Sequence, residues 1–520
     1  MSLIVYLPLV LLLAVPLSYL IAASVAARSS GECQARFAFA AFALAVLAGL
    51  THVLATGVQS LDTVVSPWLS AKPLNLVLLV LISGIGAAVA RFSVNYFAAE
   101  PRESDYYQSL YFTLAATTTA VVSNHLLILL GAWLAISLSL HRLLMFYPER
   151  PRAALAAHKK FIFARLAEVF LLAAVFLLYA EHGTWQIDAL LAAYPKAGLS
   201  GFEHAAAVFI ALTALIKCAQ LPVHGWLIQV VESPTPVSAL LHAGIINLGG
   251  YLLLLFAPLL AQAPGARWLI LIVAGLSFLL AGLAMLTRVS VKVRLAWSTS
   301  AQMGLMLVEC ALGLYALALL HLLAHSCYKA YAFLSVGSAV EQSVQQRLYP
   351  SVAMPTQAQW SVALGAALLL LGALLSILPS GHYYSPWLLL LGMLSLVLLP
   401  GRASWPQLLP SAALASVLLA AYGLQKMLAA GLFALPAPAY SALADLWFAA
   451  LIAALFVAYL ALQYAADSAF VARAWHVLFA GLYLDEWSSR LTLAVWPRPI
   501  PKPLNAKKPA FSRFVEEPSL

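Results

Sequence analysis

The stretch that decides the fold spans residues 212–254 and reads LTALIKCAQLPVHGWLIQVVESPTPVSALLHAGIINLGGYLLL. It is apolar enough to cross a bilayer, yet Lys217 and His242 lie inside its apolar runs, where an ionisable group costs about 3 kcal/mol or more. Pro222 follows soon after Lys217. Because proline lacks a backbone donor, we expect the helix to break there and to free a carbonyl inside the membrane. The stretch therefore predicts a helical membrane protein whose helices break beside buried charges.

The composition of the whole chain supports a membrane location. Of its 520 residues, 63% are hydrophobic and only 9% are charged, and the mean hydropathy is +0.93. A soluble domain carries about a quarter of charged residues. Apolar runs of roughly 20 residues recur without the alternation of barrel strands, so each run predicts a spanning helix. We predict an all-α polytopic membrane protein with about 13–15 transmembrane spans.

The predicted organisation has three parts. Residues 1–465 form the transmembrane bundle, and residues 466–497, which mix charged residues with Trp and Leu, predict an amphipathic surface helix. Residues 498–520 are rich in proline and lysine and predict an extended cytoplasmic tail. The predicted spans are residues 2–26, 34–58, 72–97, 107–123, 124–145, 161–182, 203–228, 237–260, 268–287, 294–315, 316–340, 358–379, 385–400, 408–433 and 440–463.

The charges of the connecting loops predict the orientation. Loops that follow even-numbered spans carry little beyond Lys72, Lys196 and Arg267. Loops that follow odd-numbered spans carry Arg28, Arg36, Arg91, Arg102, Arg150, Arg152, Lys159, Lys160, Arg288, Lys292, Arg294, Arg347 and Arg402. The positive-inside rule places the second group in the cytoplasm and the amino terminus on the periplasmic side of a bacterial inner membrane. The net charge of +9 is then a topology signal, and the first span is expected to be retained rather than cleaved.

A row of ionisable residues marks the stretch HLLAHSCYKAYAFL, residues 321–334. His321, His325 and Lys329 recur every fourth residue, so a helix places all three on one face along about 12 Å of its axis. Histidine titrates near neutrality, and the protonation of a buried lysine responds to nearby carboxylates. Such a row has the chemistry that a proton relay needs.

Further candidates for proton transfer lie in other spans, each with a structural alternative. A single intramembrane histidine often hydrogen-bonds a neighbouring helix, and a glutamate near a helix end can extend to the interface. These candidates are Glu168, with His224, Glu309 and His141 as accessory residues, and the prolines expected to break helices beside them are Pro222, Pro234 and Pro236.

No metal or redox centre is predicted in this chain. His321 and His325 have a spacing that can bind zinc, but no HExxH motif surrounds them, and Lys329 on the same face would repel a cation. The cysteines are dispersed without a CxxC pair, which favours neither an iron–sulfur cluster nor a disulfide framework. They are Cys33, Cys218, Cys310 and Cys327.

Two long strings carry a resemblance to a known family. KCAQLPVHGWLIQVVESPTPVSALLHA and VKVRLAWSTSAQMGLMLVECALGLYALALLHLLAHSCYKAYAFLSVGSAV resemble the antiporter-like membrane subunits of respiratory complex I, membrane hydrogenases and multisubunit sodium/proton antiporters. The resemblance is clearest from Trp133 to Val340, within a family core of about residues 107–340. It implies an antiporter-like helical bundle with broken helices.

The resemblance also implies roles for individual residues. The proton-translocating lysine of the family falls on Lys217, and an acid thought to modulate that lysine falls on Glu168. The central relay falls on His321, His325 and Lys329. The histidine of the next broken-helix region falls on His242.

Two departures from the family pattern are visible. The family motif AWExxxLxSYLLIxFY appears here as AWLAISLSLHRLLMFY, so Leu134 stands where the family has a coupling glutamate. The predicted span 358–379 has no charge, although the family normally carries an exit lysine there. A standard complex I pump should lack neither.

Within the family, the ESPTP region and the ending GLYLDEWSSRLTLAVWPRPIP look most like the membrane subunits of DAB inorganic-carbon accumulation systems. This implies a cation-conducting, energy-coupling subunit without catalytic activity or a cofactor of its own. Its partner would be DabA, a large zinc protein resembling a β-carbonic anhydrase, and ion flow would drive one-way hydration of CO₂ to bicarbonate.

Two other functions stay open at this point, as does the ion. The chain can instead be a proton-pumping subunit of a complex I-like, hydrogenase or cation/proton antiporter complex, or a membrane anchor with relic charges. Lysine and histidine relays suit H⁺, since neither protonated group can ligate Na⁺, but related antiporters move both ions.

Overall fold

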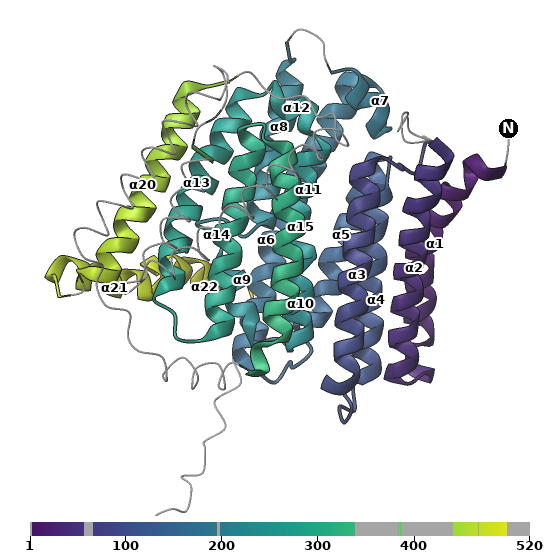
Figure 1. Ribbon diagram of the computed structural model, residues 1–520, viewed down its shortest axis with the longest axis horizontal. Helices are drawn as coiled ribbons and strands as arrows, with labels where there is room; N and C mark the ends of the chain where they lie inside the picture. The colour runs from purple at the N-terminus through teal and green to yellow at the C-terminus, as the bar shows by residue number, and fades with distance from the viewer. Residues whose placement is uncertain are drawn as a thin grey trace, which may run out of the picture.

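The computed structural model describes residues 3–56, 66–194, 198–338, 383, 385–386, 440–465 and 467–496. These residues form a bundle of upright helices, with the amino-terminal helices on one side and α20 on the other (Figure 1). Beyond two isolated bridges, the described residues form no β structure, so the predicted all-α fold class is confirmed.

The helices fall into three consecutive groups along the chain. The first comprises α1 (Leu3–Val25), α2 (Gly31–Thr56), α3 (Pro73–Tyr96), α4 (Glu103–Val122) and α5 (Leu126–Leu144). The central group comprises α6 (Pro151–His182), α7 (Ile187–Ala192), α8 (Gly201–Lys217), α9 (Gly225–Gln229), α10 (Thr235–Ala243), α11 (Leu248–Leu255), α12 (Ala257–Ala261), α13 (Pro264–Leu286), α14 (Val291–Ala311) and α15 (Tyr315–Leu334). The last comprises α20 (Ala442–Tyr464), α21 (Ala469–Phe479) and α22 (Leu484–Val495).

Nine segments of the described residues are long and apolar enough to span a membrane. Helices α4, α8 and α14 also lie where spans were predicted. They are not among the nine segments, because each is too polar or too short. The predicted spans 358–379 and 408–433, most of 385–400, and the tail 498–520 lie outside the described residues.

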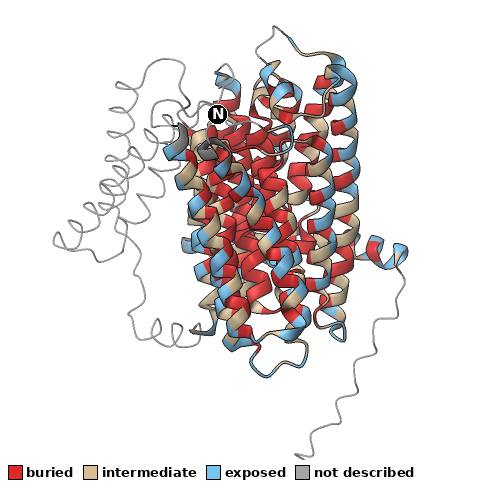
Figure 2. Ribbon diagram, turned by 90° about the vertical axis from the view of Figure 1, so that its right-hand side faces the viewer, coloured by how far each residue is buried: buried red, intermediate tan, exposed pale blue. Residues whose placement is uncertain are grey.

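The centre of the bundle is the interrupted segment Thr235–Leu255, whose most apolar part is completely buried. Its helices α10 and α11 contact α3, α8, α14 and α15, so neighbours surround this segment on several sides. Figure 2 shows the same arrangement, with buried residues filling the interior and exposed residues on the outer faces and the loops. The polar groups of this segment therefore meet protein rather than lipid.

The prediction for the sixth span was wrong at its start. Helix α6 begins at Pro151 rather than at residue 161, with proline in the first turn, where its missing N–H costs nothing. This extension brings Lys159 and Lys160 into the helix, where they are 0% and 3% exposed. These two lysines are therefore buried side chains and not loop charges, because partners on other helices compensate them.

The predicted span 203–228 is broken, and the break begins before Pro222. Helix α8 ends at Lys217, and Ala219 adopts the left-handed region with φ 51°. The Gln220 side chain donates to the Cys218 carbonyl at 2.7 Å, and the Ser300 hydroxyl donates to the Ala219 carbonyl at 2.9 Å. Backbone groups freed by the break are thus satisfied by side chains, as a membrane interior requires.

The predicted span 237–260 is also interrupted, at Gly244 directly after α10. Asn247 donates to the Ala243 carbonyl at 2.8 Å and to the Ser326 hydroxyl of α15 at 2.6 Å. One amide side chain therefore satisfies the helix end and joins it to the neighbouring helix. Of the prolines expected to break helices, Pro222 lies between α8 and α9, whereas Pro234 and Pro236 lie at the start of α10.

The predicted single surface helix at 466–497 is two helices, α21 and α22, in the described part of that range. Leu482 and Tyr483 separate them, with φ values of 60° and 55° that no continuous helix allows. The two helices run crosswise from the lower end of α20 (Figure 1), with α21 against α13 and α22 against α6 and α9.

Candidate functional site

Lys217 ends α8 and lines a small cavity at the first helix break. Its Nζ lies 4.9 Å from the centroid of the Trp133 ring on α5, a cation–π contact. Lys160 and Glu168 line the same cavity from α6. Helices α6 and α8 therefore bring two lysines and one carboxylate together, and α5 adds the Trp133 ring.

Hydrogen bonds through Ser137 organise this lysine cluster. Lys160 Nζ donates to the Ser137 carbonyl at 2.7 Å and to its hydroxyl at 3.1 Å. Arg165 donates to the same hydroxyl at 2.8 Å and forms an ion pair with Glu168 at 2.8 Å. Because Lys160 and Lys217 lie near one carboxylate, that of Glu168, the protonation states of these three groups depend on one another.

Sequence reasoning missed Lys160, Arg165 and Ser137 at this site. The sequence places Lys160 in a loop, because the predicted span begins one residue later. A predicted helix that begins earlier would include Lys160. It would place Lys160 on the same face as Glu168, eight residues later, and so indicate that the two belong to one site. Nothing in the local sequence marks Ser137 as their common acceptor.

Leu134, the position of the missing family glutamate, does not line the cavity. It is 39% exposed, whereas the adjacent Trp133 is buried against Lys217. The outward face of α5 therefore presents an apolar side chain at this position. The carboxylate of the lysine cluster comes from Glu168 instead.

A second cluster lies between α14 and α15. His321 Nδ1 pairs with a Glu309 carboxylate oxygen at 3.0 Å, and its Nε2 lies 2.9 Å from the Gln302 side-chain oxygen. Glu309 is buried and pairs with this histidine, so it does not extend to an interface. The two polar residues of α14 fix the orientation of the His321 ring.

His325 and Lys329 continue the row on the same helix. The His325 ring lies 6.3 Å from the His321 ring, and both of its nitrogens lack a hydrogen-bond partner among the described residues. Lys329 is fully buried, and its Nζ donates to the Leu295 carbonyl at 3.0 Å.

His242 joins this histidine row from α10. Its Nδ1 lies 3.0 Å from the Thr299 hydroxyl, and its ring stacks on Phe333 of α15 at 4.4 Å. Helix α14 thus supplies a polar partner for each of three residues, His242, His321 and Lys329. Sequence reasoning missed Thr299 and Gln302, although both lie on a polar face of a helix in an apolar chain.

The two clusters meet at α10. Leu241, Ile245 and Ile246 line the Lys217 cavity, and His242 lies within this same short segment. No hydrogen bond or ion pair between described residues joins the lysine cluster to the histidine row. Apolar neighbours of His242 in the sequence therefore line the Lys217 cavity, and the two clusters are not joined directly.

Of the remaining candidates, His141 is close enough to Lys160 to interact with its charge, whereas His224 interacts with the charge of Asp485. His224 is buried directly before α9, with its ring 4.9 Å from that of Trp297. His141 lies near the end of α5, with its ring 5.9 Å from that of His158. Neither lines the Lys217 cavity. Among the described residues, no three His, Cys, Asp or Glu side chains are grouped as a metal site requires.

These features define an antiporter-like membrane subunit, in which lysine, histidine and glutamate lie at the breaks of membrane helices. Residues 123–394 match the model of the NADH:quinone oxidoreductase/Mrp antiporter transmembrane family, and the chain belongs to this family.

Within the family, the chain is similar to inorganic carbon transporter subunits. It is 48% identical to the probable inorganic carbon transporter subunit DabB of Hydrogenovibrio crunogenus, over 85% of this chain and 86% of the relative. It is 40% identical to subunit DabB2 of Halothiobacillus neapolitanus, over 70% and 69%. With NADH-quinone oxidoreductase subunit L of Mycobacterium tuberculosis it shares 33% identity, over 52% of this chain and 43% of the relative.

The fold also matches a solved structure, that of the Mrp complex from Dietzia sp. DQ12-45-1b. The TM-score is 0.55 at 21% sequence identity. The match covers 93% of this chain, which spans 56% of the length of the matched chain. The two chains therefore share a fold.

The contact between Thr299 and His242 yields a first prediction. Thr299→Val keeps the shape of the side chain but removes the hydroxyl that contacts His242, and a hydrogen bond is worth about 1 kcal/mol. We therefore expect proton uptake to fall about five-fold in proteoliposomes that contain this chain with its native partner subunits. Thr299→Ser, which keeps the hydroxyl, is the matched control and should stay near the wild-type rate. A wild-type rate in Thr299→Val would show that the contact has no role in transport.

Proposed function

We propose that this chain is the proton-conducting, energy-coupling membrane subunit of a two-component inorganic-carbon uptake complex. The proposal is carried by the sequence similarity to DabB relatives. For the DabB subunit of Hydrogenovibrio crunogenus, this similarity extends over 86% of the relative's length. The buried lysine cluster and histidine row support it, because they supply titratable groups in a membrane-embedded bundle. We place the complex in a bacterial inner membrane, with the amino terminus on the periplasmic side.

In this proposal each cluster has its own part in proton transfer. Lys217 accepts and releases a proton at the first helix break, and Glu168 modulates its affinity for that proton from the same cavity. His321, His325 and Lys329 relay protons along α15. His242 lies on the broken segment between the clusters and passes protons from one to the other when that segment moves.

The partner in this proposal is a large DabA-like zinc subunit that resembles a β-carbonic anhydrase. Zinc in that partner would supply the nucleophile for CO₂ hydration, and proton flow through this chain would make the hydration run one way to bicarbonate. The present chain would bind neither the metal nor the CO₂.

The alternative is a proton-pumping subunit of a redox complex. The similarity to subunit L supports it, but the match covers only 43% of that relative, against 86% of the DabB relative. Leu134 and the uncharged 358–379 segment also favour the carbon-uptake proposal. Protons are preferred over Na⁺ because protonated Lys and His side chains cannot ligate a metal cation.

Replacing Lys217 tests the conducting role directly. We expect Lys217→Ala to reduce proton uptake by proteoliposomes of the purified complex to the level of empty vesicles, because the titratable group at the break is gone. Arg152→Ala removes a basic side chain of α6 that is 86% exposed, and it should leave the rate unchanged. Wild-type flux in Lys217→Ala would rule out conduction through this residue.

Purification of the tagged chain from its native membrane tests the partner. Gentle extraction, mass spectrometry and metal analysis should find one large partner with bound zinc at a fixed ratio to this chain. A set of iron–sulfur and quinone-binding subunits would instead support the redox alternative and would leave Leu134 as a departure to explain.

A further inference from the structure

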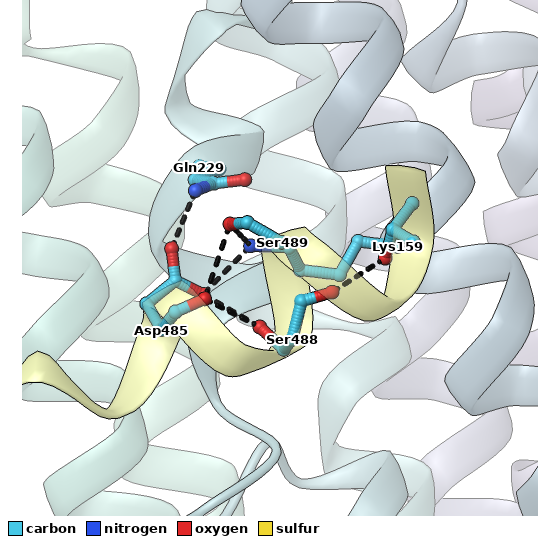
Figure 3. Close-up of polar contacts among 6 residues, drawn as sticks. Lys159, Gln229, Asp485, Ser488 and Ser489 are labelled. Atoms are coloured by element: carbon cyan, nitrogen blue, oxygen red, sulfur yellow. Dashed lines mark hydrogen bonds and ion pairs between the residues drawn. The ribbon is translucent and has the colours of Figure 1, made fainter. Parts of the chain in front are cut away.

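The carboxylate of Asp485, at the start of α22, binds groups from two other helices (Figure 3). Lys159 Nζ of α6 donates to one of its oxygens at 2.7 Å, and Gln229 of α9 donates to the other at 2.5 Å. The Ser488 hydroxyl also donates to it, at 3.0 Å. Lys159 donates a second hydrogen bond, since its Nζ lies 2.8 Å from the Ser489 hydroxyl. One carboxylate therefore ties α22 to both α6 and α9.

Both helices held by Asp485 also form walls of the Lys217 cavity. The residue after Lys159, Lys160, lines that cavity from α6. On α9, Trp226 lines it, within the same short helix as Gln229. Asp485 thus binds side chains of the same two helices that enclose Lys217.

A third contact links α22 to the cavity. The Trp487 ring of α22 lies 6.0 Å from the Phe163 ring of α6, edge to face, and Phe163 lines the cavity. Arg288 holds the preceding helix α21, because it donates to the carbonyls of Phe479 at 2.7 Å and Leu478 at 2.8 Å. The carboxy-terminal pair of helices is therefore anchored on both sides of Asp485.

The first residue of α9 is shaped for this close approach. A Cβ added at Gly225 would overlap the Asp485 carboxylate. Glycine at this position thus lets α22 lie directly against the start of α9. The contact depends on the absence of a side chain there.

We propose that Asp485 is a positioning residue that sets the spacing of α6 and α9 around Lys217, so that the docked α22 controls proton transfer at the first helix break. The Lys159 side chain is fully buried, whereas 30% of the Asp485 side chain is exposed. Solvent therefore reaches this ion pair only from the Asp485 side. The proposal rests on the conducting role of Lys217. It adds that the carboxy-terminal helices are part of the conducting unit and not only a surface anchor.

The test uses the whole complex in proteoliposomes, with proton flux measured over a range of pH. Gln229→Ala releases α9 from Asp485 without leaving an unpaired charge, and we expect flux to fall about ten-fold, with a shift in the pH of half-maximal flux, because the surroundings of Lys217 change. Asp485→Asn should act in the same way and more strongly, because it also leaves Lys159 without its counter-ion. Asp467→Asn removes a carboxylate charge from an exposed residue shortly before α21, and it is the matched control.

A double-mutant cycle covers the case in which Asp485→Asn prevents assembly. Gly225→Ala should reduce flux in the wild-type background, because the new methyl group displaces the carboxylate. In the Gly225→Ala background, Gln229→Ala should add little further loss, since the displaced carboxylate no longer binds Gln229. Additive losses, or an unchanged pH profile in Gln229→Ala, would overturn the proposal. If Lys217→Ala also kept full flux, the conducting role itself would be wrong.

Discussion

The structure depends on one constraint, which is that a charged group buried in a membrane protein needs compensation from nearby groups. Lys217 meets it at a helix break, where α6 brings Glu168 and α5 brings the Trp133 ring into its cavity. The break frees backbone carbonyls, and Ser300 of α14 satisfies one of them. The position of the lysine therefore dictates which helices must pack around it.

The same principle explains the second cluster and the segment between the two. Helix α14 supplies a carbonyl for Lys329, a hydroxyl for His242 and a carboxylate for His321. Helix α10 ends just before Gly244, and Asn247 donates a hydrogen bond to the carbonyl that this helix end leaves free. The two polar clusters thus share one short, buried and interrupted helix, which is the element best placed to couple their protonation states.

Much of this arrangement could be predicted from the sequence, because an ionisable residue in an apolar run is visible without a structure. Lys217 and the row of His321, His325 and Lys329 were found in this way. Their partners were not, since those come from helices distant in sequence. The bond between Lys159 and Asp485 joins residues 326 positions apart, and no local pattern distinguishes that buried lysine from a loop charge. The functional roles of the candidate residues remain predictions.

The most direct measurement of the central claim is the formation of labelled bicarbonate inside proteoliposomes that contain the purified complex, with labelled CO₂ supplied outside. The account predicts that bicarbonate accumulates only when a proton gradient is imposed, and that an ionophore that collapses the gradient abolishes the accumulation. Accumulation at the same rate without a proton gradient, or under a sodium gradient alone, would contradict it.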